Sequence, residues 1–174
     1  MKRSLEVQLN KKVSEETFRA IALELKSRDS QDYDRTFITY YLPGMRVGTG
    51  AWATTHFDPD LEVRILGLTA EEETRLATEP APANRKVIGR WLDESPYVGS
   101  RITIFREGGK LYIEQKFKDG SSLKMELLEK RSPLGRRFDK LEGSSTGDHW
   151  VIDSHGNLQM RDNDGLIETA KKIE

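Results

Sequence analysis

Closely spaced turn signals in the second half of the chain constrain its fold more than any other feature. From residue 86 onward, short runs of alternating apolar and polar residues are interrupted by pairs such as Gly108-Gly109 and Asp119-Gly120. Pairs of this kind join antiparallel strands through tight hairpins. About eight short strands are expected, near residues 87–92, 101–105, 111–117, 122–128, 136–141, 150–152, 158–161 and 166–170. Local pairing of these strands predicts an up-and-down sheet, which is either open or closed into a barrel.

Alternation inside these runs predicts that the sheet has one apolar face. Leu111 and Ile113 alternate with Tyr112 and Glu114, and neighbouring side chains on a strand point to opposite faces. Closing the strands into a barrel would bury the apolar face and remove the exposed edges. Because strands of about five or six residues make a shallow barrel, we favour a packed interior over a ligand cavity.

The first half of the chain is expected to combine strands with a helix. Ser14 is a suitable N-cap for a helix that ends near Arg28. The apolar stripe of this helix consists of residues at helical spacing: Phe18, Ile21, Ala22 and Leu25. Alternating or β-branched runs predict strands near residues 5–9, 36–42, 52–57 and 61–65. The first half therefore has the predicted order β-α-β-β, with or without one further strand, and the chain belongs to the α+β class.

A domain boundary is expected after a short second helix. Thr69 and Glu72 form a capping box that would open a helix over residues 70–78. Pro80 and Pro82 then end this helix and stiffen the connection. We therefore predict three segments: a β-α-β-β subdomain with the second helix over 1–78, a linker over 79–86, and an antiparallel meander or small β-barrel over 86–174.

Two stretches resemble known proteins. Gly89-Arg90-Trp91, at the start of the meander, resembles the G-x-W motif of lipocalins and related calycin barrels, in which the tryptophan plugs the closed end. This resemblance covers about half of the chain and implies a cup for a small apolar ligand. The sequence departs from the lipocalin pattern because it has no cysteine pair and its strands are short. Residues 40–45 and 50–57 resemble a stretch of uncharacterised bacterial proteins, which implies no particular activity.

Composition argues against binding to nucleic acid and against crossing a membrane. Lys and Arg total 28 against 29 Asp and Glu, so the formal net charge is -1 and the chain has no global attraction to polyanions. One basic cluster, Lys130-Arg131 with Arg136-Arg137, is flanked by Glu129 and Asp139. No run reaches the roughly 20 apolar residues that span a bilayer, and the N-terminal residues are typical of a strand and not of a signal peptide. We expect a soluble chain without a nucleic-acid partner, either cytoplasmic or the mature form of an exported protein.

The strongest candidate for catalysis or metal binding is a short stretch around His56. The absence of cysteine excludes disulfides, thiolate metal sites and cysteine nucleophiles. His56, Asp58 and Asp60 are close enough in the sequence for a metal site or an acid-base group. Asp58-Pro59-Asp60 is also typical of a turn between two strands, and we favour this interpretation.

The other histidines and the acidic loops give weaker signals. For His149 and His155 we favour exposed neutral imidazoles over a metal site with Asp148 and Asp153. For residues 162–165 we favour a hairpin turn over a calcium loop, because the twelve-residue pattern of such loops is missing. No metal or cofactor is therefore expected.

Aromatic residues are concentrated in the first half, where they either pack in a core or contact a partner. Core packing is the default expectation. By the period of two, Trp52, Thr54 and His56 would share one face of a strand, which makes this face the first place to look for a site. The candidate ligand-binding or partner-binding residues are Tyr40, Tyr41, Met45, Trp52 and His56.

Three functions stay open at the level of the sequence. The first is a non-catalytic binding or accessory protein of a bacterial cell, which uses a sheet edge or residues 40–57 against a protein partner. The second is a carrier of a small apolar ligand with a lipocalin-like barrel. The third is a metal-dependent hydrolase that uses His56 and Asp58. We favour the first, because the sequence lacks catalytic signatures.

Overall fold

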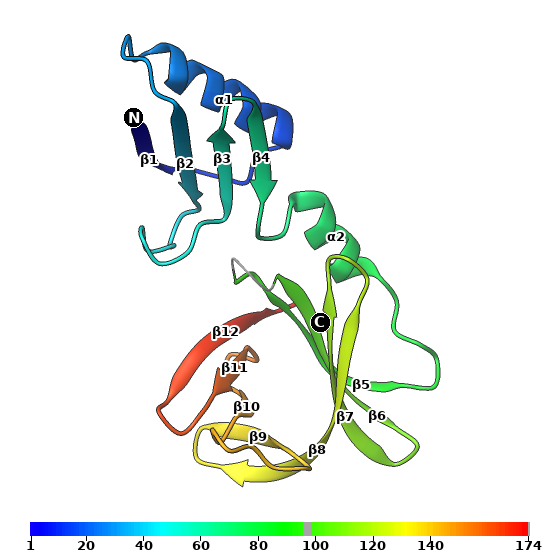
Figure 1. The fold of residues 1–174 in the computed structure, drawn as a ribbon. Coiled ribbons are helices and arrows are strands. Elements are labelled where there is room, and N and C mark those ends of the chain that lie inside the picture. Colours follow the sequence, from blue (N-terminus) through cyan, green and yellow to red (C-terminus); the bar gives the residue numbers. More distant parts are fainter. Residues whose placement is uncertain (96–98, 174) are drawn as a thin grey trace. The chain divides into compact units, whose positions relative to one another are not determined.

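The computed structural model describes residues 1–95 and 99–173, and it divides the chain into two units, Met1–Glu71 and Glu72–Glu174. Each unit has its own sheet (Figure 1), and each has its own buried core. The division falls inside the second helix, α2 (Ala70–Thr78). It lies earlier in the chain than the predicted linker at residues 79–86. The α+β composition expected from the sequence is confirmed.

The first unit is a four-stranded sheet with a helix on one face. Its elements in chain order are β1 (Lys2–Gln8), α1 (Glu15–Ser27), β2 (Arg35–Tyr41), β3 (Ala53–Phe57) and β4 (Leu61–Ile65). The strands lie in the order β1-β2-β3-β4, with β1 parallel to β2 and the other neighbours antiparallel. Strand β4 is thus the further strand that the sequence left open.

Helix α1 begins and packs as its sequence predicts. The Ser14 hydroxyl accepts a hydrogen bond from the Thr17 amide at 3.3 Å, which satisfies one of the free amides at the helix start. On the buried face, the Phe18 ring lies 4.6 Å from that of Tyr40 and 5.5 Å from that of Trp52. The core of the unit consists of Phe18, Ala22, Ile38, Tyr40, Trp52, Ala53 and Phe57.

The second unit closes eight antiparallel strands into a barrel. They are β5 (Lys86–Asp93), β6 (Ser100–Glu107), β7 (Lys110–Phe117), β8 (Ser122–Ser132), β9 (Gly135–Lys140), β10 (His149–Ile152), β11 (Leu158–Arg161) and β12 (Leu166–Lys172). Each strand pairs with its neighbours in the sequence, and β12 pairs with β5 to close the barrel. The sequence had left an open or a closed sheet as alternatives, and the structure has the closed one.

Large apolar side chains pack inside the barrel. The Trp91 ring lies against Gly89, where a Cβ atom would overlap it, and its indole N–H donates to the Gly156 carbonyl at 2.7 Å. The buried core consists of Trp91, Ile102, Ile104, Leu111, Ile113, Leu127, Phe138, Trp150, Leu158 and Ala170. These residues form the packed interior that the sequence favoured.

Several barrel strands are longer than the sequence predicted. Strands β5, β6 and β7 have 8 residues each and β8 has 11. The predicted end of β8 at Leu128 is wrong, because the strand continues to Ser132 in pairing with β9. Apolar alternation stops at Leu128, but backbone pairing requires no apolar side chains, so the charged residues beyond it extend the strand.

Buried arginines fasten the end of α2 to the outside of the barrel. Arg101 on β6 donates to the carbonyls of Leu76 and Glu79 at 3.0 and 3.2 Å, and Arg90 on β5 also donates to the Glu79 carbonyl. Carbonyls at a helix C-terminus lack intrahelical partners and attract cations. Burial lowers the pKa of Arg101, and the nearby Arg90 lowers it further. Burial therefore opposes the charge of Arg101, and the two carbonyls at the helix end offset that cost.

The segment predicted as a linker is also bound to the barrel. Arg85 forms ion pairs with Glu114 at 2.7 Å and with Glu107 at 3.3 Å, and its guanidinium lies 4.2 Å from the Phe105 ring centroid. The hydrogen bond from Arg85 to Glu114 raises the pKa of the arginine. Residues 79 and 85 are therefore both attached to the second unit.

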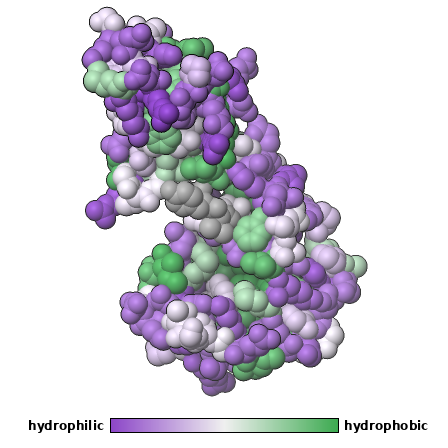
Figure 2. Space-filling model, in the orientation of Figure 1, coloured by the Kyte–Doolittle hydropathy of each residue, from purple (hydrophilic) through white to green (hydrophobic). Residues whose placement is uncertain are grey.

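The face of the molecule that Figure 2 shows is mainly hydrophilic. Figure 2 shows hydrophilic residues over most of the visible face, with hydrophobic residues in small separate patches. The large apolar side chains that are exposed include Leu23, Leu123, Leu128, Leu134, Leu141, Leu166 and Ile167. Scattered exposed leucines are normal, so only their surroundings can give one of them a role.

Candidate functional site on the open face of the sheet

In the first unit, α1 covers one face of the sheet, and the other face carries polar and aromatic side chains. Among the residues that the structure describes in this unit, no helix packs on this second face. The register places Phe37, His56 and Glu62 in one row across β2, β3 and β4, and Thr54 opposite Arg64 in the next. We call this surface the open face.

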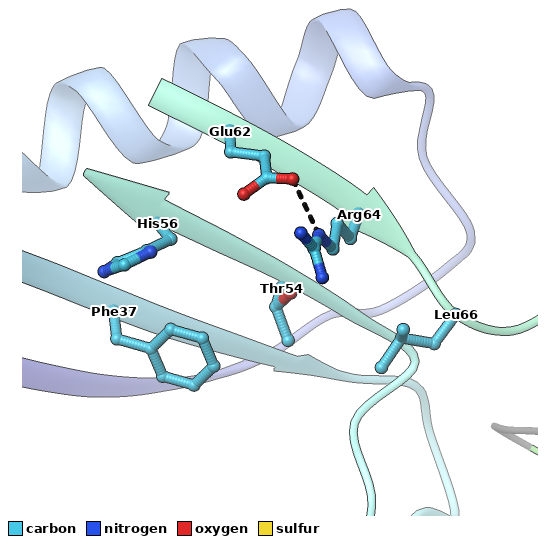
Figure 3. Close-up of a pocket in the computed structure, with 6 residues that line it drawn as sticks. All are labelled: Phe37, Thr54, His56, Glu62, Arg64 and Leu66. Carbon is cyan, nitrogen blue, oxygen red and sulfur yellow. Dashed lines mark hydrogen bonds and ion pairs between the residues drawn. The ribbon is translucent and has the colours of Figure 1, made fainter. Parts of the chain in front are cut away.

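A shallow pocket of about 280 Å³ lies on the open face (Figure 3). Its lining residues come from β2, β3 and β4 and from the residue that follows β4. They are Phe37, Thr54, His56, Glu62, Arg64 and Leu66. The Phe37 and His56 rings meet edge to face, with centroids 5.8 Å apart. Arg64 Nε lies 2.7 Å from Glu62 Oε1, and the Lys2 ammonium lies 5.9 Å from the Phe37 ring centroid. The pocket therefore combines an aromatic pair with both signs of charge.

His56 is the most available polar group of this pocket. Its side chain is partly exposed, and it makes no hydrogen bond or ion pair with any side chain in residues 1–95 or 99–173. The charged neighbours Glu62 and Arg64 are already paired with each other. The imidazole can thus donate or accept a hydrogen bond with an incoming group, and the Phe37 ring beside it is of the kind enriched at interfaces.

The stretch from Asp58 to Asp60 is a turn, as the sequence favoured. The Asp58 amide donates to the Asp60 carbonyl at 3.2 Å between β3 and β4, and the Asp58 carboxylate pairs with Arg35 at 3.1 Å. His56, Asp58 and Asp60 also line a second pocket of about 340 Å³. Within the described part of the chain, however, no three His, Asp or Glu side chains are grouped so that they could hold a metal ion.

The structure separates the five residues predicted to bind a ligand or partner. Tyr40 and Trp52 are buried against α1, where burial raises the pKa of Tyr40 and its hydroxyl lies 2.9 Å from that of Thr55. Tyr41 is buried, and its hydroxyl accepts from the Gly48 amide at 3.1 Å. Met45 is half-buried, with its sulfur 3.3 Å from the Leu42 amide. His56 alone of the five lines the pocket.

The predicted common face of Trp52, Thr54 and His56 is wrong for Trp52. Strand β3 begins at Ala53, and the Trp52 carbonyl accepts from the amides of Leu66 and Gly67 at 2.8 and 3.1 Å. Trp52 therefore lies just before the pleated strand, and the alternation of side chains with a period of two does not extend to it. The Trp52 ring packs against Phe18 on the helix side, and its indole N–H donates to the Leu68 carbonyl at 3.2 Å.

Sequence reasoning missed most residues of the open face. The sequence predicts Glu62 and Arg64 only as polar positions of a strand, and Phe37 only as one of the aromatic residues that either pack in a core or contact a partner. It assigns Leu66 no role. The signal that could have found them is the alternation in residues 36–42 and 61–65 combined with the pairing of both runs to β3. Pairing puts their outward side chains in rows beside His56.

In the second unit, the structure contradicts the prediction for His149 and confirms those for His155 and for residues 162–165. The expectation of an exposed His149 is wrong: it is 8% exposed on β10, with Nδ1 2.8 Å from the Gly147 carbonyl. Strand pairing on both sides encloses it. His155 is exposed, as expected. The hairpin turn at residues 162–165 is confirmed, because the Asp162 carboxylate accepts from the amides of Asp164 and Gly165.

Comparisons with known proteins assign the chain to no family. No family model matches it, and no curated protein or solved structure does. The closed barrel is compatible with the resemblance of Gly89-Arg90-Trp91 to lipocalin-like barrels. No helix of the described residues is long and apolar enough to cross a membrane.

Proposed function

We propose that the protein is a non-catalytic binding or accessory protein whose protein partner contacts the open face of the first unit. The observation that supports this proposal is the Phe37–His56 pair, which lies in a pocket on the sheet face away from α1. Aromatic residues are enriched at the centres of protein interfaces. The opposite face of the same sheet spends its aromatic rings on core packing.

The dimensions of the open face suit a short segment of a partner. The four strands have 5 or 7 residues each; at about 4.8 Å between strands and about 3.3 Å per residue, they present on the order of 300–400 Å². A stable protein interface buries about 800 Å² on each side. The partner would therefore also contact the edge of β1, whose outer backbone groups could pair with an extended peptide.

Affinity capture with matched variants tests this function. Wild-type protein, a Phe37→Ser and His56→Ala double variant, and a Leu23→Ser control would each be used to capture proteins from a bacterial lysate. Leu23 is exposed on α1, so its variant alters an apolar side chain outside the open face. We expect one partner to be retained by wild type and control and to be lost from the double variant. Equal capture by all three would contradict the proposal.

A carrier of a small apolar ligand is the second candidate, supported by the closed barrel and by Gly89-Arg90-Trp91. The packed interior leaves the first candidate ahead. Native mass spectrometry of the purified chain tests the alternative, because a bound lipid or other apolar molecule would add a defined mass. Release of such a molecule on Trp91→Ala would favour the carrier.

A metal-dependent hydrolase using His56 and Asp58 is the third candidate. The ion pair of Asp58 with Arg35 occupies the carboxylate that this mechanism needs. A hydrolytic activity that is lost in His56→Ala, and that no second substitution restores, would revive this hypothesis.

A further inference from the structure

The hairpin formed by β8 and β9 places like charges directly opposite each other. We call residues 129–139 the basic hairpin. In its register, Lys130 faces Arg137 and Arg131 faces Arg136. Like charges in directly opposite positions destabilise a strand pair. Two consecutive pairs of this kind are a local conflict, and such conflicts mark positions where function outweighs stability.

Neighbouring carboxylates compensate this charge only in part. Asp139 pairs with Lys130 at 2.7 Å and with Arg137 at 2.8 Å. Glu129 pairs with Arg136 at 2.8 Å and, across the barrel end, with Arg106 at 3.1 Å. Each carboxylate is therefore shared by two cations.

Arg131 is the one cation of the hairpin that pairs with neither of these carboxylates. It is exposed and has no ion pair or side-chain hydrogen bond with the described residues. The hairpin is thus locally positive, although the whole chain carries a net charge of -1. A local field of this sign attracts anions within about a Debye length, which is about 8 Å at physiological salt.

The tip of the basic hairpin presents an apolar side chain between these cations. Pro133 and Leu134 form the turn between Ser132 and Gly135, and Leu134 is 54% exposed. The Leu134 amide donates to the Ser132 hydroxyl at 3.1 Å. Gly135 has a φ of 129° and lies so close to Ile152 that a Cβ atom would overlap the Ile152 carbonyl. The C-terminal end of the turn therefore packs closely against β10 of the barrel.

A groove of about 680 Å³ runs beside the tip. Its lining residues are Glu129, Lys130, Arg131, Ser132, Gly135 and Arg136. Three of them are cations, and the single carboxylate is already paired with Arg136 and Arg106. The groove can accept an anionic group next to Arg131 without displacing an existing ion pair.

We propose that the basic hairpin docks the protein on an anionic phospholipid surface. Leu134 enters the interfacial region, while Arg131, Arg136, Lys130 and Arg137 contact headgroup phosphates. Cations around an exposed apolar side chain are the combination that interfacial binding uses. Single-stranded nucleic acid fits less well, because it needs aromatic stacking platforms and Phe138, the one aromatic residue of the hairpin, is fully buried.

Vesicle co-sedimentation of the full chain tests this inference. The vesicles contain phosphatidylcholine alone, or phosphatidylcholine with phosphatidylglycerol in equal parts. We expect binding only to the anionic vesicles, and weaker binding as salt is added. Arg131→Gln should weaken binding about fivefold, as expected for one cation near the surface. Leu134→Ser should weaken it by up to about tenfold through loss of apolar burial.

Two controls separate lipid binding from changes in folding. Leu123→Ser removes an equally exposed leucine, 57% accessible, from the other end of β8, and it should bind like wild type. Arg131→Lys keeps the charge and should retain most of the binding. Circular dichroism of each variant reports whether the barrel is still folded.

Several outcomes would overturn the inference. One is equal binding to neutral and anionic vesicles, and another is equal binding of Leu134→Ser and Leu123→Ser. Binding of soluble glycerophosphate as tightly as anionic vesicles would identify a simple anion site. Binding of an oligouridine without vesicle binding would identify a nucleic-acid surface in its place.

Discussion

The two units bury a tryptophan in the same way but cover their sheets differently. Trp52 in the first unit and Trp91 in the second each lie against a glycine, Gly67 and Gly89, where a Cβ atom would overlap the ring. Each indole N–H donates to a backbone carbonyl. The first unit then covers one sheet face with α1, whereas the second closes its sheet on itself.

This difference determines where each unit can bind. A sheet covered by one helix keeps a second face and two edge strands, so recognition can use a broad surface. A closed barrel has no edges, and its inner face is packed with side chains. In the second unit, the outer face and the ends of the barrel, such as the tip of the basic hairpin, are therefore the places for an interaction.

Removing either tryptophan is expected to have the largest effect. Trp52→Ala and Trp91→Ala should each destabilise their own unit by about 3–5 kcal/mol, through lost burial and the cavity left behind. Because the cores are separate, amide hydrogen exchange should rise in the unit that carries the change and stay near wild type in the other. Equal loss of protection in both units would show that they fold as one.

Filling the space under each ring should have a smaller effect. Gly67→Ala and Gly89→Ala put a methyl group where the indole lies, and we expect each to cost about 1–3 kcal/mol by overpacking. Urea denaturation followed by tryptophan fluorescence measures this. An unchanged urea midpoint for one variant would mean that its indole ring can shift at no cost in stability. The two units would then differ in how tightly the tryptophan packs against its glycine.

Freeing the end of α2 tests a contact made only in the second unit. Arg101→Met removes the donor to the Leu76 and Glu79 carbonyls, and we expect a loss of about 1–3 kcal/mol. Hydrogen exchange of residues 72–79 should increase while the barrel strands stay protected. If those amides keep wild-type protection, Arg90 and apolar contacts alone hold the helix end.

Acid should weaken the second unit through Asp148. Hydrogen bonds from Lys140, then Thr146, hold the pKa of Asp148 at about 2, below the ordinary value of 3.8. A lowered folded-state pKa stabilises the protein above pH 3.8, and this contribution is lost as the pH falls towards 2. Asp148→Asn should therefore flatten the decline in melting temperature over this range. A decline as steep as that of wild type would assign it to other carboxylates.

The smallest expected effect is a gain in stability. Arg131→Gln removes one member of a like-charge pair, so the second unit should become more stable by about 0.2–1 kcal/mol. Thermal unfolding at low salt measures this change. A loss of stability would show that Arg131 supports the hairpin in a way that its position opposite Arg136 does not reveal.

Much of the fold could be predicted from local patterns, because each depends on neighbouring residues. Ser14, the stripe through Phe18 and Ala22, and the turn pairs such as Gly108-Gly109 located the helix and the hairpins. The extension of β8 to Ser132 could not be found in this way, since its evidence is pairing with β9. Of the residues around the pocket, only Thr54 and His56 were placed on one outward face.

The sequence by itself determined the approximate positions of the helices and strands and, for most strands, which side is polar and which is apolar, since both follow from periodicity along the chain. Tertiary structure alone decided that Trp52 turns inward, that β12 meets β5, and that Phe37 lies beside His56. These contacts join residues far apart in the chain, and many pairings are compatible with the same local pattern. Which pairing forms depends on how the whole set of side chains packs.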